Sequence, residues 1–133
     1  TRGEIITFLW RAMGRPEPEP APSPFSDVIA TNFYYKPVLW AAEQDMASGS
    51  LFSPKSPCTR AETVSFLWRS AGSPEASAVT GFTDVGPSAS CAQAVSWAVS
   101  NNIVTGTSDV TFSPGDTCTR GQIVTLLWRY LGK

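Results

Sequence analysis

The chain has 133 residues, enough for one domain or for two to three small repeats, and 42% of them are apolar. Its net charge is −1 and it has no lysine or arginine run, which disfavours a nucleic-acid partner. It contains no histidine, and no apolar stretch approaches the roughly 20 residues that cross a bilayer. We therefore expect no metal site, no cofactor, no nucleic-acid partner and no membrane span.

Three segments of the chain share one pattern, in which Thr-Arg-x-Glu or Thr-Arg-x-Gln precedes an apolar run that ends in Leu-Trp-Arg. They occupy residues 1–11, 59–69 and 119–129, so their first residues are 58 and 60 apart. Phe-x-Asp-Val recurs at 25–28 and 82–85, and a glycine followed by Phe-Ser-Pro recurs at 49–54 and 106–114. Ordered markers at one period indicate tandem repeats.

The markers and the breaker-rich joints between them predict five successive parts. These are the closing helix of a first repeat at 1–15, a proline-rich linker at 16–24, a repeat at 25–72, a linker at 73–81 and a repeat at 82–133.

Two helices are expected in each repeat. The first covers roughly residues 35–47 or 91–101, with Pro37 placed in the first turn, and the second begins at each Thr-Arg. One repeat cannot bury its apolar face alone, so neighbouring repeats should pack together. The prediction is an all-α fold, a compact pseudo-symmetric bundle of helical repeats with at most a short extended pairing around Phe52 or Phe112.

The Thr-x-x-Glu pattern is typical of a capping box at a helix start. The expected caps are Thr1 with Glu4, Thr59 with Glu62, and Thr119 with Gln122. Because residue 1 is itself a cap, we expect the chain to be a piece of a longer protein. The Trp residues at matching helical positions are expected in the core.

Arg2, Arg60 and Arg120 each occupy the first turn of a helix, where the helix dipole disfavours a cation. One interpretation is a structural ion pair with Asp27 or Asp84. The other, which we favour, is an anion site that combines the planar guanidinium with unpaired amides of the helix start. The two aspartates are expected in a structural role, binding backbone amides near them in sequence.

Three cysteines leave at least one without a partner, and their spacing matches no zinc motif. A disulfide is favoured over buried thiols, with Cys91 and Cys118 as the expected pair.

In order, Phe-x-Asp-Val, a helix, Gly…Phe-x-Pro and Thr-Arg-x-Glu resemble the S-layer homology (SLH) module over essentially the whole chain. The resemblance implies a three-pronged arrangement that holds a bacterial surface protein to a peptidoglycan-linked wall polysaccharide, often an acidic, pyruvylated one. It also implies that Arg2, Arg60 and Arg120 contact the ligand, with Gly49 and Gly106 as backbone neighbours.

The chain departs from the family pattern at several places. Gly3 and Gly121 replace the alanine of the motif, and Gln122 replaces its acid. Phe33 and Ser90 stand where a tryptophan usually opens the first helix, so Phe33 is the remaining candidate for stacking on a sugar.

The expected function is non-enzymatic anchoring at the extracellular surface of a bacterium. Catalysis is disfavoured because no histidine dyad is possible and the repeat acids are accounted for as caps. The alternative is a protein-interaction or assembly scaffold, with self-association through the incomplete first repeat.

Overall fold

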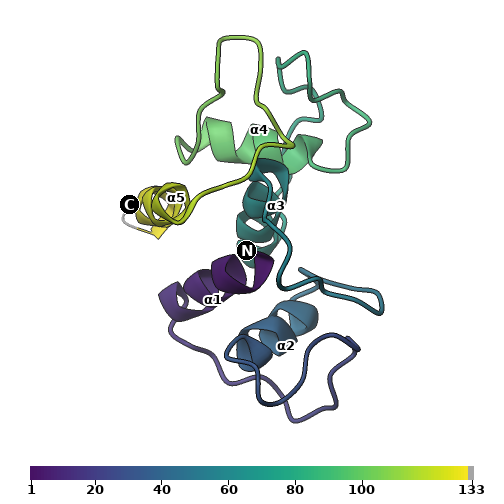
Figure 1. Cartoon of the computed structure of the whole chain (residues 1–133). Helices are drawn as coiled ribbons and strands as arrows, with labels where there is room; N and C mark the ends of the chain where they lie inside the picture. Colours follow the sequence, from purple (N-terminus) through teal and green to yellow (C-terminus); the bar gives the residue numbers. More distant parts are fainter. Residues whose placement is uncertain (132–133) are drawn as a thin grey trace. The chain divides into compact units, whose positions relative to one another are not determined.

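The computed structural model describes residues 1–131 and is helical (Figure 1). The helices are α1 (Arg2–Ala12), α2 (Tyr35–Glu43), α3 (Arg60–Ser70), α4 (Ala92–Ser100) and α5 (Arg120–Leu131). Within these residues no strand forms, which confirms the all-α class. One isolated antiparallel bridge joins Thr59 to Thr117, so the extended pairing lies there and not around Phe52 or Phe112.

The opening helices α2 and α4 are shorter than the sequence predicted. Helix α2 ends at Glu43, and Asp45 then adopts a φ of 57°; α4 ends at Ser100, and Asn102 adopts a φ of 58°. Asp and Asn tolerate this left-handed region better than most residues, and the turn stops each helix. Pro37 lies in the first turn of α2, as expected.

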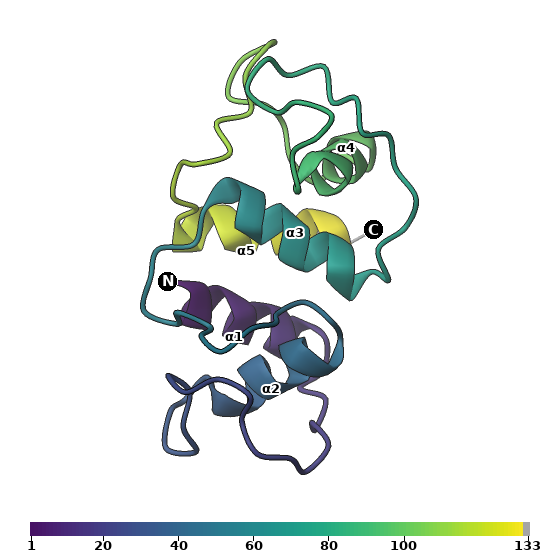
Figure 2. The ribbon, with the colours of Figure 1, turned by 90° about the vertical axis from the view of Figure 1, so that its right-hand side faces the viewer.

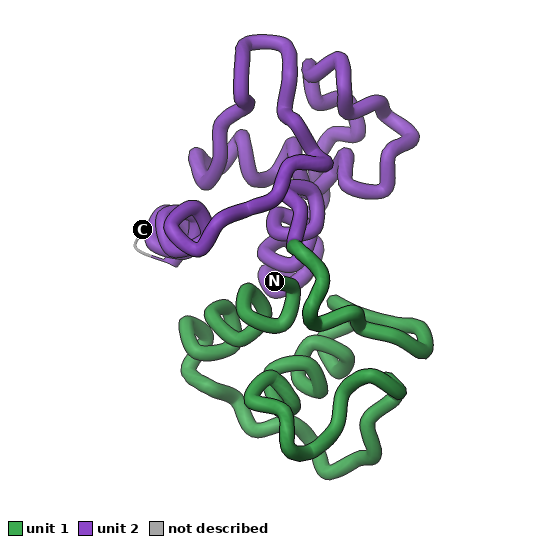
Figure 3. The backbone as a smooth tube through the Cα atoms, in the orientation of Figure 1, with its two compact units in different colours: residues 1–57 green, residues 58–133 purple. Residues whose placement is uncertain are grey.

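The chain divides into two compact units, residues 1–57 and 58–133 (Figure 3). In unit 1, α1 packs against α2, and in unit 2, α3 packs against α4, as both ribbon views show (Figures 1 and 2). The boundary falls inside the expected repeat 25–72 because the helix that closes one sequence repeat packs with the helix that opens the next. The assembly of repeats into one pseudo-symmetric bundle stays a prediction.

Each unit has its own buried apolar residues. The largest fully buried ones in unit 1 are Ile6, Leu9, Val28, Val38, Met46 and Phe52, and those in unit 2 are Val64, Leu67, Val95, Ile103, Phe112 and Ile123. Phe52 and Phe112 are the phenylalanines of the two Phe-Ser-Pro loops, so each loop is anchored in the core of its unit. This burial fixes the loop of unit 1 against the start of α1 and the loop of unit 2 against the start of α3.

The tryptophans do not share one environment. Trp40 is buried, and Trp10 and Trp68 are partly buried with indole N–H groups that donate to the carbonyls of Pro16 and Pro74. Trp128 is 74% exposed, so the prediction of a core position is wrong for this residue. It lies near the end of α5, on the same helical face as exposed Val124.

Candidate functional site

The guanidinium groups of Arg2 and Arg60 hold the Phe-Ser-Pro loop of their own unit. Arg2 Nε donates to the carbonyl of Phe52 at 2.9 Å, and Arg60 Nε donates to that of Phe112 at 3.0 Å. Each guanidinium carbon also lies over the ring of the same phenylalanine, at 4.8 Å for Arg2 and 4.6 Å for Arg60. An arginine at the start of these helices therefore has a structural role in addition to any ligand.

Asp27 and Asp84 bind the same loops through the backbone amides of these loops. Asp84 accepts from the amides of Phe112 and Ser113 at 2.9 and 2.8 Å, and Asp27 makes the equivalent pair of bonds at 3.0 and 2.8 Å in unit 1. The expected structural role is present, but the bonded amides lie 25 to 29 residues along the chain and are not local. In the described part of unit 2, Arg60 and Asp84 thus bind one loop and form no ion pair with each other.

These amide bonds stabilise the charged form of both carboxyl groups. For Asp84 the hydrogen bond from Phe112 is the main cause, and the pKa lies below its ordinary value of 3.8. For Asp27 partial desolvation acts to raise the pKa, but the amides of Phe52 and Ser53 together with nearby Arg2 outweigh it, so this pKa is lowered too.

The helix starts are occupied differently in α5 than in α1 and α3. Each of the three carries the Thr-x-x-Glu or Thr-x-x-Gln capping pair. The second amide of α1, on Gly3, donates to Pro54, and that of α3, on Ala61, donates to Pro114. These amides are not available to a ligand, contrary to the expectation of unpaired groups. Of these three second amides, that of α5, on Gly121, is the one with no acceptor among residues 1–131.

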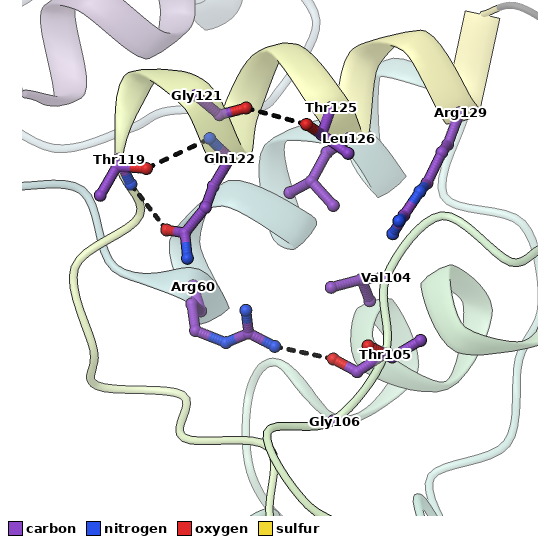
Figure 4. A pocket seen from close by; sticks show the side chains of 10 residues that line it. All are labelled: Arg60, Val104, Thr105, Gly106, Thr119, Gly121, Gln122, Thr125, Leu126 and Arg129. Atoms are coloured by element: carbon purple, nitrogen blue, oxygen red, sulfur yellow. Dashed lines mark hydrogen bonds between the residues drawn. The ribbon is translucent and has the colours of Figure 1, made fainter.

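A pocket of about 520 Å³ opens beside this amide, wholly within unit 2 (Figure 4). It is bounded by the start of α3, the loop after α4 and one face of α5. The lining residues are Arg60, Val104, Thr105, Gly106, Thr119, Gly121, Gln122, Thr125, Leu126 and Arg129. Two of them are arginines and none is acidic, so the pocket is cationic.

Arg60 is fixed in this wall by the protein itself. Its Nη2 donates to the carbonyl of Thr105 at 2.8 Å, in addition to the bond from Nε to Phe112 (Figure 4). The adjoining Gly106 admits no side chain, because a Cβ there would lie 2.5 Å from the ring of Phe82 and 2.6 Å from a carbonyl oxygen. Among the described residues no acceptor binds Nη1 of Arg60, which leaves this donor for another molecule.

Gln122 and Arg129 complete the pocket from α5. The Oε1 atom of Gln122 accepts from the amide of Thr119 at 2.8 Å, so its NH₂ group is the part directed into the pocket (Figure 4). Arg129 Nη1 reaches the carbonyl of Ile103 at 3.4 Å. Sequence reasoning treated Gln122 only as a cap and missed Arg129, although their spacing of seven residues places both on one face of a helix.

Only some of the residues expected to bind ligand come together here. Arg60 and Gly106 line the pocket, whereas Arg120 starts α5 but does not line it. Arg2, Gly49 and Phe33 belong to unit 1. Gly49 has a φ of 96° and an open surrounding, and Phe33 is 65% exposed and packs edge-on against Tyr34. Their roles as ligand contacts stay predictions.

All three cysteines are free thiols in this structure, and the expected disulfide between Cys91 and Cys118 stays a prediction. Cys91 precedes α4, whereas the backbone amide of Cys118 donates a hydrogen bond to the backbone carbonyl of Cys58. In the part of the chain that the structure describes, no three His, Cys, Asp or Glu side chains gather as a metal site. None of the described helices is long and apolar enough to cross a membrane.

The family model of the S-layer homology domain matches residues 81–124. This segment, about a third of the chain, is similar to the S-layer homology domain. The matched segment includes Asp84, Gly106, Phe112 and Gln122, and thus the aspartate that binds the Phe-Ser-Pro loop and the part of the pocket's wall at the start of α5. No curated protein and no solved structure matches the chain.

S-layer homology domains anchor surface proteins to the cell wall by binding wall polysaccharide, and the family is a binding family and not a catalytic one. The match therefore associates this chain with the cell surface.

Proposed function

We propose that this SLH chain anchors a bacterial surface protein to an acidic secondary wall polysaccharide, and that the pocket of unit 2 binds the acidic group. The observation that carries the proposal is the charge of the pocket wall, which has two guanidinium groups and no carboxylate. The unbonded amide of Gly121 at the start of α5 adds a donor and the positive end of a helix dipole.

The donors are held in place before a ligand arrives. Arg60 is fixed by two carbonyls and by the Phe112 ring, so binding a carboxylate costs little further side-chain entropy. The remaining nitrogen, Nη1, can donate a charge-assisted hydrogen bond to a carboxylate.

The pocket also offers apolar surface next to these donors. Val104 and Leu126 lie in the wall beside Arg60 and Arg129 (Figure 4). A pyruvyl ketal carries a carboxylate and a methyl group on one carbon, so a cationic pocket with an apolar part fits it better than a purely polar one. We extend the proposal to Arg2, Gly49 and Phe33 in unit 1 and to Arg120, which would bind further acidic sugars. Several weak sites on one polymer then act together through effective concentration.

The proposal is tested by binding of the chain to purified wall polymer before and after removal of the pyruvyl groups. We expect removal to weaken binding at least about tenfold, the loss of one charge-assisted contact of roughly 1.4 kcal/mol or more. Binding to the acidic polymer should also weaken as salt is raised from low to physiological concentration. Equal binding to the two polymers contradicts the proposal.

A second candidate is assembly of the chain with another copy of itself, and the exposed apolar face of α5 favours it. Val124, Trp128 and Leu131 are 56%, 74% and 42% exposed and recur at helical spacing. Sedimentation velocity over a hundredfold range of concentration tests this candidate, since self-association would raise the sedimentation coefficient. A concentration-independent monomer excludes it.

A further inference from the structure

Cys58 and Cys118 face each other across a short antiparallel pairing in unit 2. The amide of Cys118 donates to the carbonyl of Cys58 at 2.8 Å, and the amide of Arg60 donates to that of Asp116 at 2.8 Å. Between these two bonds lies the bridge of Thr59 and Thr117. The register therefore places the two cysteines directly opposite one another.

This register suits a disulfide. Opposed residues of an antiparallel pair point to the same face and have Cα atoms about 4.5–5.5 Å apart. Disulfides span Cα separations of about 4.4–6.8 Å. Cys91, the partner that the sequence favoured, precedes α4 and has no place in this pairing.

The two thiol groups also meet at one side chain. The Sγ atom of Cys58 lies 3.4 Å from the hydroxyl oxygen of Thr63, and this hydroxyl also lies close enough to the Cys118 side chain to affect the pKa of its thiol. The Thr63 hydroxyl itself donates to the carbonyl of Thr59 at 2.9 Å, which leaves its oxygen to accept from the thiol of Cys58. All three side chains are buried, with exposures of 0% for Cys58, 4% for Cys118 and 0% for Thr63.

We propose that Cys58 and Cys118 form a disulfide when the chain meets a disulfide oxidant. One cysteine thiolate attacks the reagent disulfide and releases a thiol, which leaves a mixed disulfide on the protein. The second thiolate then displaces the remaining half of the reagent as a second thiol. The protein loses two electrons and two protons, and the reagent becomes two thiols.

The bond would join the chain just before α3 to the chain just before α5. Arg60 and Thr119, on opposite walls of the pocket, follow the two cysteines by two residues and one residue. The disulfide closes a loop of about 60 residues, which restricts the unfolded chain more than a short loop does. The inference does not depend on the proposed function, because it concerns only the covalent state of unit 2.

The test is to refold the 133-residue chain from denaturant in a glutathione redox buffer, so that burial cannot block access to the thiols. Thiols are then alkylated and the digest is analysed by mass spectrometry. We expect one cross-linked peptide pair that joins Cys58 to Cys118, with Cys91 alkylated. The melting temperature should rise by about 10 °C or more over the chain reduced with dithiothreitol.

Cys91→Ser is the matched control, and it should keep both the cross-link and the rise in melting temperature. Cys58→Ser should lose both. If this variant does not fold, the cross-link and the melting temperature of the wild-type chain and of Cys91→Ser still test the inference. The inference is overturned if Cys58 and Cys118 are both alkylated, if either is linked to Cys91, or if each carries glutathione.

Discussion

The nitrogen atoms of Arg60 differ in their bonding, and we propose that the one without a protein acceptor binds the ligand. Nε and Nη2 bind carbonyls of Phe112 and Thr105, while Nη1 has no acceptor among the described residues. The guanidinium also covers the ring of Phe112. The sequence indicated that a cation at a helix start requires a stabilising partner, and it predicted either an aspartate of the chain or an anionic ligand as that partner. The actual partners, the carbonyls of Thr105 and Phe112, lie 45 and 52 residues along the chain from Arg60, so no local sequence pattern predicts them.

Arg60→Ala is therefore expected to weaken both stability and glycan binding. Loss of two charge-assisted hydrogen bonds and a cation–π contact at a partly exposed position should lower the free energy of unfolding by about 1–2 kcal/mol. Urea unfolding measures this change, and a binding titration well below the midpoint measures affinity. Arg60→Lys is the matched variant, because it keeps the charge but cannot form the two bonds together. Unchanged stability in both variants would contradict the structural role.

At the scale of elements, the starts of helices were predictable and the loop contacts were not. A capping box lies within four consecutive residues, so Thr59 and Glu62 predict the start of α3 from local sequence alone. The clamp of Asp84 on the Phe-Ser-Pro loop joins residues 28 and 29 positions apart and appears only when α3 and α4 pack. The pocket was missed in part for the same reason, since its walls come from α3, α5 and the loop after α4.

The aspartate clamps make stability depend on pH in the acid range. The pKa values of Asp27 and Asp84 are lower in the folded chain than their ordinary value of 3.8, so the unfolded chain binds protons more readily. Their contribution is complete above that value and is lost as the pH falls through the lowered pKa values. We expect the melting temperature to fall between pH 5 and about pH 3.

Asp27→Asn with Asp84→Asn should reduce this dependence while lowering the melting temperature at neutral pH. The measurement is a series of thermal melts monitored by circular dichroism for the wild type and the double variant. If both proteins show the same slope between pH 5 and 3, the clamps are not the source of the acid sensitivity.

At the scale of the whole molecule, sequence repeats and packing units are offset by one helix. The repeat pattern shows where similar segments recur, but it does not show which helix each one packs against. The structure pairs α3 with α4, so unit 2 is residues 58–133, whereas the last sequence repeat begins at residue 82.

Fragments that end at the same residue can distinguish the two descriptions. We expect residues 58–133 to fold with a cooperative thermal transition, because α3 supplies the apolar face on which α4 packs. Residues 82–133 lack α3 and should show little helix by circular dichroism. A cooperative transition in the shorter fragment would contradict the assignment of α3 to this unit.

The central claim is that the cationic pocket of unit 2 binds the acidic group of the wall polymer, and Gln122→Glu tests it most directly. The substitution keeps the capping pair, since Glu4 and Glu62 serve the same way in α1 and α3, but it places a carboxylate in the pocket with Arg60. Gln93→Glu, an exposed change in the first turn of α4 outside the pocket, is the matched control.

Isothermal titration with acidic wall polymer is the measurement. We predict that Gln122→Glu weakens binding at least about tenfold, equivalent to roughly 1.4 kcal/mol, while Gln93→Glu binds as the wild type does and neither variant melts lower. Wild-type affinity in Gln122→Glu would show that the acidic group is bound elsewhere.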